Sequence, residues 1–563
     1  MRTQFVICLL SALSVFAAGC YDDKGNYDYS DVNELVIDMN HAYTYAITLG
    51  ETFELNPEIR FVNGEGDISR LTYKWYLGED NYTQDDWNTL KFRWTPEKLL
   101  SNQELCLEVT DPVTGIQYLA SINCFVESRY QDDGVMILSE EDGKTRFSFV
   151  KIPKADRYDD SRGRHFYKYV EYKNAYLTGN DEELPAGPLM LHQHFCADDS
   201  TVGQILILTE NGAIDIDGKA FQKDPIGELS SVFLDGTYPA ELGHVTDAMF
   251  MARVDLVADT EGRLYSRLKN TSELFHSGYF FPNRLSLDNE ELSGCRLIPA
   301  PFDGIKSCLV YDTDKKRLLV IGDSGGVSGA PDAGAGHAFA LAESSEPSSS
   351  TPGSEEAYVP VNDLSGIDDL LWIGYSKDFG VGYTLVFEKN GRYYCQEFEL
   401  KKNYSSFRFS VESPTINEIK GLPQKPGCVY APAYKDRNPL VYLAVGNQLY
   451  IYDRSNPTLP VKAYNASGFR ADIVDMDGEG YNSPWLALAL SDGSVLVLNS
   501  WKSNEESNKF IYYDSKKEMI KRPERPESDT EDLWEETAPV TFGKIRDIRF
   551  KIQPNQGWTV PRS

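Results

Sequence analysis

The sequence has few positive charges, no regular cysteine spacing and, after its opening segment, no apolar run long enough to cross a bilayer as a helix. Lysine and arginine number 55 against 86 aspartates and glutamates, so the 563-residue chain carries a formal net charge of −31. Such a chain repels phosphate backbones and anionic lipid surfaces. We therefore expect no nucleic-acid partner and no membrane contact through the folded part of the chain.

Motifs of several common enzyme classes are also missing. The sequence contains no P-loop, no G-x-G-x-x-G and no H-E-x-x-H pattern. The string GDSGG at residues 322–326 resembles a nucleophilic serine motif, but VSGAPDAGAG follows it and is a poor helix former, so Ser324 lacks the helix that a nucleophile elbow needs. None of the seven histidines sits in the local motif of a serine protease. The sequence therefore shows no assembled catalytic constellation.

A short apolar segment opens the chain. Arg2 precedes the run FVICLLSALSVFAAG, which is too short to span a bilayer comfortably and ends in small residues, as a secretory signal peptide does. AAGC at residues 17–20 resembles a bacterial lipobox, in which the leader is removed before a cysteine that is then lipidated. The resemblance implies a signal peptide over residues 1–19 and acyl chains on Cys20 that hold the protein in a membrane. The alternative is an ordinary signal peptide with a chance cysteine.

Acidic residues follow the cysteine directly. Asp22 and Asp23 resemble the export signal that sends lipoproteins of the Bacteroidota type to the cell surface. We therefore expect residues 20–29 to be a lipidated acidic tether at the cell outer membrane, with the rest of the chain on the extracellular side.

The remaining cysteines do not form a disulfide framework. Of nine cysteines, Cys8 leaves with the leader and Cys20 is lipidated, so the seven that remain are an odd number with no regular spacing. Cys106 and Cys124 flank the turn DPVTG and are the one pair that a hairpin would bring face to face. Buried free thiols are the favoured interpretation.

Residues 30–128 alternate apolar and polar side chains in short runs separated by turns, which is the pattern of half-buried strands. Trp75 lies in the middle of one run, where a sandwich buries an aromatic side chain between its sheets. The stretches LGETFELNPEI, YKWYLGED and LEVTDPVTG are similar to a PKD-type immunoglobulin-like domain, and the start CYDDKGNYDY resembles the PKD-like lipoproteins of Bacteroidota nutrient-uptake loci. We therefore predict a PKD-like, immunoglobulin-type sandwich here.

The rest of the chain, residues 129–563, repeats one pattern. Two apolar runs bracket a polar turn near residues 142, 211, 261, 314, 390, 446 and 492, at spacings of 46 to 76 residues. Asn-Gly, Asp-Gly or Glu-Gly at several of these turns favours hairpins, and a further short strand often precedes the hairpin. A strand plus a hairpin at this period is typical of a propeller blade. We predict an all-β chain with a β-propeller of seven blades; the alternative is a stack of two or three sandwich domains.

The C-terminal segment indicates how the propeller ring closes. GKIRDIRFKI matches the leading strands of the blades but has no hairpin, so we predict that it completes the blade that begins at residue 134 and leaves no edge unpaired. Two segments interrupt the repeat: residues 323–358 are small and polar, which predicts a disordered insertion, and residues 502–540 are dense in charge, which predicts a solvated insertion.

One segment is a candidate calcium loop. In VDMDGEGY, three acidic residues alternate around a glycine turn: Asp475, Asp477 and Glu479. The segment resembles the calcium loops of FG-GAP-type propeller blades, where hard oxygens converge on Ca²⁺. The alternative is a plain acidic turn, so we expect either no cofactor or calcium.

A second segment has a spacing that can chelate zinc. LHQHFC places His192, His194 and Cys196 on one face of a strand, and His165 lies upstream. No fourth ligand is indicated by the sequence, so ordinary packing of a strand face is favoured.

Resemblance to PKD-like lipoproteins of nutrient-uptake loci implies a non-catalytic role at the cell surface. The implied partners are a TonB-dependent transporter and its partner lipoproteins, and the implied ligand is a glycan or a peptide. Aromatic segments such as 279–281 and 393–394 fit a sugar- or peptide-stacking surface, which suggests carbohydrate binding, although core packing is the commoner role of such residues.

Two other functions stay open. A surface polysaccharide hydrolase or lyase would place carboxylates at the centre of the propeller, and the candidate acids of the blade-leading strands are Asp247, Asp368, Asp369 and Asp472. Two of them about 5 to 9 Å apart in a pocket would favour that function. A structural adhesion or assembly protein would instead have a flat ring and a large protein-binding patch.

Overall fold

The computed structural model divides into two compact units, residues 1–128 and 129–563, and the boundary falls where the strand pattern of the sequence changes. Among the residues that the structure describes, no helix is long and apolar enough to span a membrane. The structure describes residues 34–39, 44–64, 66–78, 80, 82–130, 133–152, 157–159, 164–166, 169–194, 203–228, 233–234, 244–251, 254–268, 279–298, 307–322, 335–343, 345–376, 382–403, 408–433, 438–478, 485–500, 511–519 and 538–551.

The first unit is a sandwich of short strands. One sheet has the strand order β2-β8-β7-β5, with β2 parallel to β8, and two-stranded sheets pair β1 with β4 and β3 with β6. The strands are β1 (Leu35–Asp38), β2 (Thr44–Thr48), β3 (Phe53–Leu55), β4 (Glu58–Phe61), β5 (Thr72–Leu77), β6 (Phe92–Trp94), β7 (Leu100–Thr110) and β8 (Gln117–Glu127), with a 3-10 turn η1 (Ile68–Arg70).

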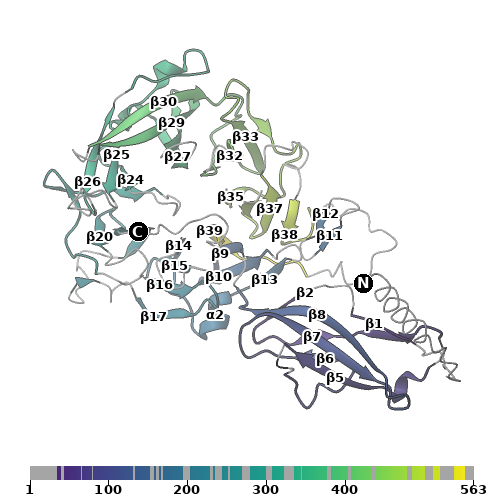
Figure 1. Ribbon diagram of the computed structural model, residues 1–563. Helices are drawn as coiled ribbons and strands as arrows, with labels where there is room; N and C mark the ends of the chain where they lie inside the picture. Colours follow the sequence, from purple (N-terminus) through teal and green to yellow (C-terminus); the bar gives the residue numbers. More distant parts are fainter. Residues whose placement is uncertain are drawn as a thin grey trace, which may run out of the picture. The chain divides into compact units, whose positions relative to one another are not determined.

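Trp75 lies in the core of the sandwich. Its side chain is fully buried, its ring centroid lies 4.9 Å from that of Phe92, and its indole N–H donates to the carbonyl oxygen of Thr89 at 2.9 Å. Burial of the ring is stabilising only because this polar N–H finds a partner. The predicted burial of Trp75 in the sandwich is thus confirmed, and Figure 1 shows the strands β5, β6, β7 and β8 of this unit.

The two cysteines that the structure describes in this unit, Cys106 and Cys124, are free. Cys106 lies opposite Ser121 and Cys124 lies opposite Gln103, so the two thiols are not cross-strand partners. Burial raises the pKa of the Cys124 thiol to about 11, which keeps it protonated and unreactive at neutral pH. The prediction of free thiols is confirmed for this pair.

In the second unit, every hairpin expected from the sequence is present as a pair of antiparallel strands. The hairpins are β9 (Gly134–Glu141) with β10 (Lys144–Lys151), β15 (Gln204–Thr209) with β16 (Gly212–Asp217), β19 (Val254–Asp259) with β20 (Leu264–Leu268), β24 (Ser307–Asp312) with β25 (Arg317–Gly322), β28 (Gly382–Lys389) with β29 (Arg392–Asn403), β32 (Leu440–Val445) with β33 (Gln448–Asp453) and β36 (Trp485–Leu490) with β37 (Val495–Asn499).

A leading strand pairs with the first strand of each hairpin, and a further strand usually lies at the outer side. The leading strands are β14 (Pro188–His194), β18 (Val245–Phe250), β23 (Cys295–Leu297), β27 (Asp369–Ser376), β31 (Cys428–Tyr430), β35 (Ile473–Gly478) and β39 (Lys544–Lys551). The outer strands are β13 (Val170–Tyr172), β17 (Lys223–Glu228), β26 (Ala338–Glu343), β30 (Arg408–Glu418), β34 (Lys462–Ala463) and β38 (Ile511–Asp514). Smaller elements are β11 (Arg157–Asp159), β12 (Arg164–Phe166), α2 (Ala175–Asn180), β21 (Ser286–Leu287), β22 (Glu290–Glu291), η4 (Ser354–Ala357) and η5 (Leu364–Gly366).

Hydrophobic side chains join each hairpin to the next one along the chain. One cluster packs β9 and β10 against β15 and β16, and another packs β15 against β18, β19 and β20. Similar clusters join β19 to β24, β24 to β28, β28 to β32 and β32 to β36. A last cluster packs β36 and β37 against β9, β10 and β39. Because the last sheet shares a core with the first, the sheets close a ring, which makes the second unit a β-propeller.

This arrangement explains the continuous apolar runs of the hairpins. In β9, Val135 and Ile137 face the last sheet of the ring, whereas Met136 and Leu138 face β15 and β16. A strand that is covered on both faces needs apolar residues at every position rather than at alternate ones. The blade count of seven stays a prediction.

The C-terminal strand closes the ring. β39 pairs antiparallel with β9, and the two strands are joined from Lys544 opposite Glu140 to Lys551 opposite Gly134. The first sheet therefore has the strand order β13-β10-β9-β39, with three strands from its start and one from the end of the chain. The closing role predicted for GKIRDIRFKI is confirmed.

Both interruptions differ in part from the expectation. Within residues 323–358, β26 pairs with β25 and then runs parallel to β30, which joins their sheets into one of eight strands. Val359, just beyond this segment, is fully buried with Ala357 in the core beside β28. The small-residue composition masked this short apolar strand; residues 323–334 lie outside the described part of the chain.

Within residues 502–540, β38 pairs with β37 and forms the outer strand of the last sheet. Its segment IYYD is only four residues long and is flanked by charged residues. The composition of the surrounding sequence therefore predicted an insertion rather than a strand. Residues 501–510 and 520–537 lie outside the described residues.

Candidate functional site

Three leading strands carry an aspartate directly after a register irregularity. The irregularities fall between Val245 and Asp247 in β18, between Ile473 and Asp475 in β35, and between Ile545 and Asp547 in β39. A bulge turns the following side chain away from its regular position. Each of these carboxylates accepts a backbone N–H from the leading strand of a neighbouring sheet: Asp247 from Leu297 at 3.2 Å, Asp475 from Ile548 at 2.9 Å and Asp547 from Leu191 at 2.7 Å.

The strongest concentration of these contacts lies where the last sheet meets the first. Asp475 uses one oxygen for its neighbour Met476 N–H at 2.9 Å and the other for Ile548 N–H. Asp477, two residues along β35, accepts the N–H of Phe550 at 2.7 Å. Two side chains of β35 thus hold the backbone of β39 from one side, while β9 pairs with its other edge. We call this contact between the last and first sheets the closing interface.

One guanidinium faces the carboxylates of the closing interface. Arg549 donates to Asp547 at 2.9 Å, and its side chain is 34% exposed whereas that of Asp547 is 6% exposed. Burial lowers the pKa of Arg549, but the charges of Asp547, Asp477 and Asp475 outweigh burial and hold the pKa above its ordinary value. Arg549 therefore stays charged.

The two aspartates of β35 have unusual acidity. Burial, with the charge of Asp547 added to it, raises the pKa of Asp475 to about 7 against the opposing effect of Arg549. Burial likewise raises the pKa of Asp477 to about 6. Three carboxylates against one guanidinium leave excess negative charge, which a bound proton relieves. The arrangement can therefore hold a proton near neutral pH, and its direct geometric role is to join β35 to β39.

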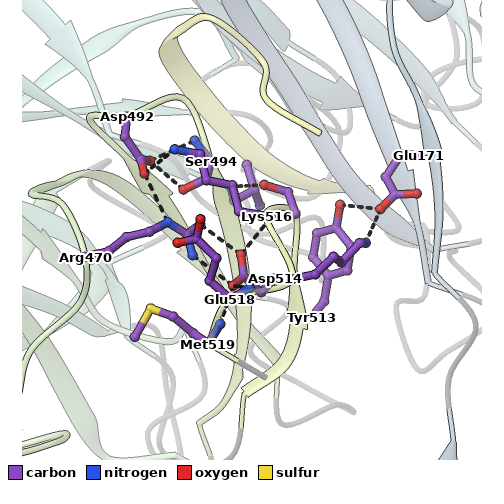
Figure 2. Close-up of polar contacts among 12 residues, drawn as sticks. Glu171, Arg470, Asp492, Ser494, Tyr513, Asp514, Lys516, Glu518 and Met519 are labelled. Atoms are coloured by element: carbon purple, nitrogen blue, oxygen red, sulfur yellow. Dashed lines mark hydrogen bonds and ion pairs between the residues drawn. The ribbon is translucent and has the colours of Figure 1, made fainter. Parts of the chain in front are cut away.

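The outer side of the same interface is also tied by polar contacts. Figure 2 shows the Tyr513 hydroxyl of β38 donating to Glu171 of β13 at 3.1 Å. Lys517 forms an ion pair with the same carboxylate at 2.6 Å. The closing interface is thus secured at the outer strands as well as at the leading strands.

A buried network fixes β38 in the position from which Tyr513 reaches Glu171. Arg470 donates to both oxygens of Asp514 at 2.8 Å and to Asp492 at 3.0 Å (Figure 2). Burial opposes ionisation of Asp492, but hydrogen bonds from Lys516 and Ser494 prevail and lower its pKa to about 2. The carboxylates and the guanidinium of this network therefore stay charged at physiological pH, and their contacts stabilise the packing of β38.

Two of the three calcium candidates lie in a strand rather than in a turn. Asp475 and Asp477 belong to β35, and their oxygens accept backbone N–H groups of β39 and of β35 itself. Glu479 lies outside the described residues. Within the described ranges, no group of three or more His, Cys, Asp or Glu side chains is arranged to hold a metal ion. Both alternatives for this segment, calcium and no cofactor, stay predictions.

The two zinc candidates whose side chains the structure describes, His192 and His194, have different partners. His192 lies 3.3 Å from Asp247, whereas His194 is fully buried, lies 3.1 Å from Asp215 and stacks on Phe250. Cys196 lies outside the described residues, as does Ser324, and the side chain of His165 is not described. The two histidines thus serve the packing of β14 against its neighbours.

The acids proposed for a hydrolase also have different partners. Asp247 accepts the N–H of Leu297, Asp368 accepts the N–H of Asn390 at 2.6 Å, and Asp369 is paired with Lys425. Asp472 directly precedes β35, and its backbone carbonyl accepts the N–H of Ser491 at 2.8 Å.

Asp547 and Arg549 of the closing interface were not identified from the sequence, and neither were Glu171 and Tyr513 at its outer side. The sequence does contain a signal for Asp547. A four-residue pattern recurs in VTDA of β18, IVDM of β35 and IRDI of β39. It consists of an apolar residue, any residue, an aspartate and a second apolar residue. Aligning the leading strands with one another would have placed Asp547 with Asp475 and Asp247.

The fold defines an all-β protein with a sandwich followed by a β-propeller whose ring is closed by the C-terminal strand. Residues 20–188 match the model of the PKD-like family, so the N-terminal part of the chain is PKD-like. The match begins at Cys20 and ends at Pro188, the first residue of β14, so it includes the first strands of the propeller as well as the sandwich.

No curated protein matches the chain. Among solved structures, a quinonprotein alcohol dehydrogenase-like protein from Bacteroides thetaiotaomicron is similar at 13% identity and a TM-score of 0.35, covering 85% of this chain and 95% of that one. Apo AztD from Citrobacter koseri is similar at 9% identity and a TM-score of 0.30, covering 85% and 98%. The Pan2 WD40 domain of Neurospora crassa follows at 9% and 0.31, covering 57% and 77%. Likeness at these scores carries no functional inference.

Proposed function

We propose that this protein is a lipid-anchored binding protein of the outer cell surface, which captures a glycan or peptide for a TonB-dependent nutrient-uptake system without catalysing a reaction. The observation that carries the proposal is the PKD-like match that begins at Cys20. Cys20 is the residue that cleavage of the lipobox-like AAGC would expose as the new N-terminus. The start of the match and the lipobox-like motif both support a mature protein that begins at this cysteine.

The geometry of the closing interface supports a non-catalytic role. Asp475, Asp477 and Asp547 direct carboxylate oxygens at backbone N–H groups of neighbouring strands. A general acid or base has to reach the reacting group of a substrate within hydrogen-bond distance. Carboxylates that are used in this way stabilise the ring, and the rigid ring then serves as a platform for ligand and partner contacts.

One observation favours the second candidate, a polysaccharide hydrolase or lyase. The pKa of Asp475, raised to about 7 by burial, is in the range that suits a general acid at neutral pH. Incubation of the soluble ectodomain with polysaccharides decides between the two: release of reducing ends or unsaturated ends by the wild type but not by Asp475→Asn would favour catalysis.

A pull-down from detergent-solubilised outer membranes tests the proposed function. Tagged protein with Cys20 intact should bring down a TonB-dependent transporter and further lipoproteins in stoichiometric amount. The matched control is Cys20→Ala, which cannot be lipidated and should lose these partners because it leaves the membrane. Recovery of the wild-type protein alone would count against the uptake role and favour an adhesion or assembly function.

A further inference from the structure

One outer edge of the propeller exposes aromatic side chains on a rigid support. The segment after residue 278 runs antiparallel to β20, with Phe281 N–H donating to Ser266 O at 3.0 Å and Leu285 N–H to Leu264 O at 2.8 Å. Within this segment Phe280 is fully buried. Its ring stacks on Phe233 at a centroid distance of 5.3 Å.

The same ring is fixed from another direction. The guanidinium of Arg267 lies 4.9 Å from the Phe280 centroid, within the range of a cation–π contact. The residues on either side of Phe280 are consequently attached to an anchored backbone, so a ligand that binds them loses little free energy to ordering of the main chain.

Side chains alternate along an extended segment, so Tyr279 and Phe281 point away from the core that Phe280 enters. Their exposed fractions are 58% and 49%. Leu268 and Leu234 lie beside them and are 41% and 38% exposed. We call these four residues, two aromatic and two leucines, the aromatic edge.

We propose that the aromatic edge is a stacking platform for a neutral glycan chain. This inference rests on the proposed binding function and names its ligand class and surface. The C–H faces of a sugar ring are apolar and pack flat on an aromatic ring, while the hydroxyl groups stay in water. Two exposed rings at alternate positions of an anchored backbone segment lie roughly 7 Å apart, which lets successive sugar units of one chain contact both.

Two features argue for a neutral glycan over other ligands. The net charge of −31 disfavours anionic polymers. A peptide would bind an edge by adding a strand, but the backbone here is already paired on both sides: Phe281 N–H donates to Ser266 O, and Leu234 N–H donates to Phe280 O at 2.9 Å. Side-chain faces, rather than backbone groups, are what this edge offers.

The test measures binding of defined neutral oligosaccharides to the soluble ectodomain by calorimetry. The probes are hexasaccharides of α-1,4-glucan, β-1,4-glucan, β-1,3-glucan, β-1,4-xylan and β-1,4-mannan. The variant Tyr279→Ala/Phe281→Ala should weaken binding of the recognised probe at least about tenfold. The matched control Leu459→Ala removes a side chain of similar exposure, 50%, elsewhere on the propeller and should leave binding unchanged. Near-UV circular dichroism checks that both variants are folded.

Each result has a distinct meaning. Selective loss in the double variant supports the platform. Binding that survives the double variant overturns the platform but leaves glycan capture standing at another surface. Failure of every probe overturns the platform, and so does binding of an unfractionated peptide digest that depends on Tyr279 and Phe281. The proposed uptake role fails separately, through absence of the transporter from the pull-down.

Discussion

At the scale of single residues, the ring depends on carboxylates that bind backbone N–H groups across sheets. Asp547 is the central one, because its carboxylate accepts from Leu191 on one side and from Arg549 on the other. A buried carboxylate that satisfies both a backbone donor and a guanidinium cannot be removed without leaving two polar groups unpaired.

Replacement of Asp547 by alanine should therefore destabilise the propeller by about 2 to 4 kcal/mol. The lost free energy comes from the unsatisfied N–H of Leu191 and from the lost ion pair between Asp547 and Arg549. Urea unfolding followed by tryptophan fluorescence measures it. Glu399→Ala, at an exposed position of β29, is the control and should change stability by less than about 0.5 kcal/mol. Equal stability of the two variants would contradict the role of Asp547.

The acidity of the closing interface predicts a dependence of stability on pH. The pKa of Asp475 is about 7 in the folded protein against an ordinary value of 3.8, so the folded state binds the proton more tightly than the unfolded state. The stability from this group is fully present below about pH 4 and is lost as the pH rises through 7. Asp477, with a pKa of about 6, acts in the same direction.

Melting temperatures of wild type and Asp475→Asn between pH 5 and pH 8 test this dependence. The wild type should lose more stability over that interval than the variant, because asparagine does not titrate. Glu399→Gln removes an exposed acid and should follow the wild type. A variant with the same pH profile as the wild type would show that Asp475 does not titrate in this range.

The donor set of Asp475 and Asp477 also predicts the effect of calcium removal. Their carboxylates accept backbone N–H groups that hold β39, and a cation would have to replace those bonds. EDTA should therefore leave the melting temperature of the propeller unchanged, and added calcium should not raise it. A calcium-dependent rise that Asp477→Asn abolishes would establish the calcium loop instead.

At the scale of elements, the closing interface is held by a close backbone approach as well as by side chains. Gly543 precedes β39 with φ +70°, and a Cβ at this position would lie 2.6 Å from the carbonyl oxygen of Glu140. Gly493, in the turn between β36 and β37, would in turn place a Cβ 2.5 Å from Gly543 O. Only glycine lets these three segments approach so closely.

Gly543→Ala should destabilise the propeller by about 2 to 4 kcal/mol, because both the positive φ and the contact with Glu140 oppose a side chain. Gly391→Ala is the matched control: its φ is +71°, but nothing lies within 4 Å of the added carbon. That variant should lose only about 1 kcal/mol. The difference between the two measures the close approach, and equal losses would show that the closing interface tolerates a methyl group there.

The sequence predicts secondary-structure elements better than it predicts the contacts between them. The hairpins were predictable because their apolar runs are continuous and their turns carry Asn-Gly or Asp-Gly, as at Asn390 and Gly391 between β28 and β29. β26 and β38 were missed because each is a short apolar run inside a polar or small-residue window. The bond from Leu191 to Asp547 joins residues 356 positions apart, so no local pattern announces it.

At the scale of the whole molecule, a sandwich and a propeller follow an N-terminal cysteine that would carry the anchor. The net charge of −31 disfavours contact between the folded part and anionic lipid surfaces, so the proposed attachment would depend on the acyl chains. The proposed function needs this attachment, because a binding protein that serves a transporter has to stay beside it.

The most direct test is the mass of the N-terminal peptide of the mature protein, purified from outer membranes of cells that express the full chain. We predict a peptide that begins at Cys20, lacks residues 1–19 and carries acyl chains on the cysteine. Protease treatment of intact cells should then digest the attached protein, which shows that it faces outward. An unmodified Cys20, or a mature chain that begins at another residue, would contradict the proposed surface lipoprotein.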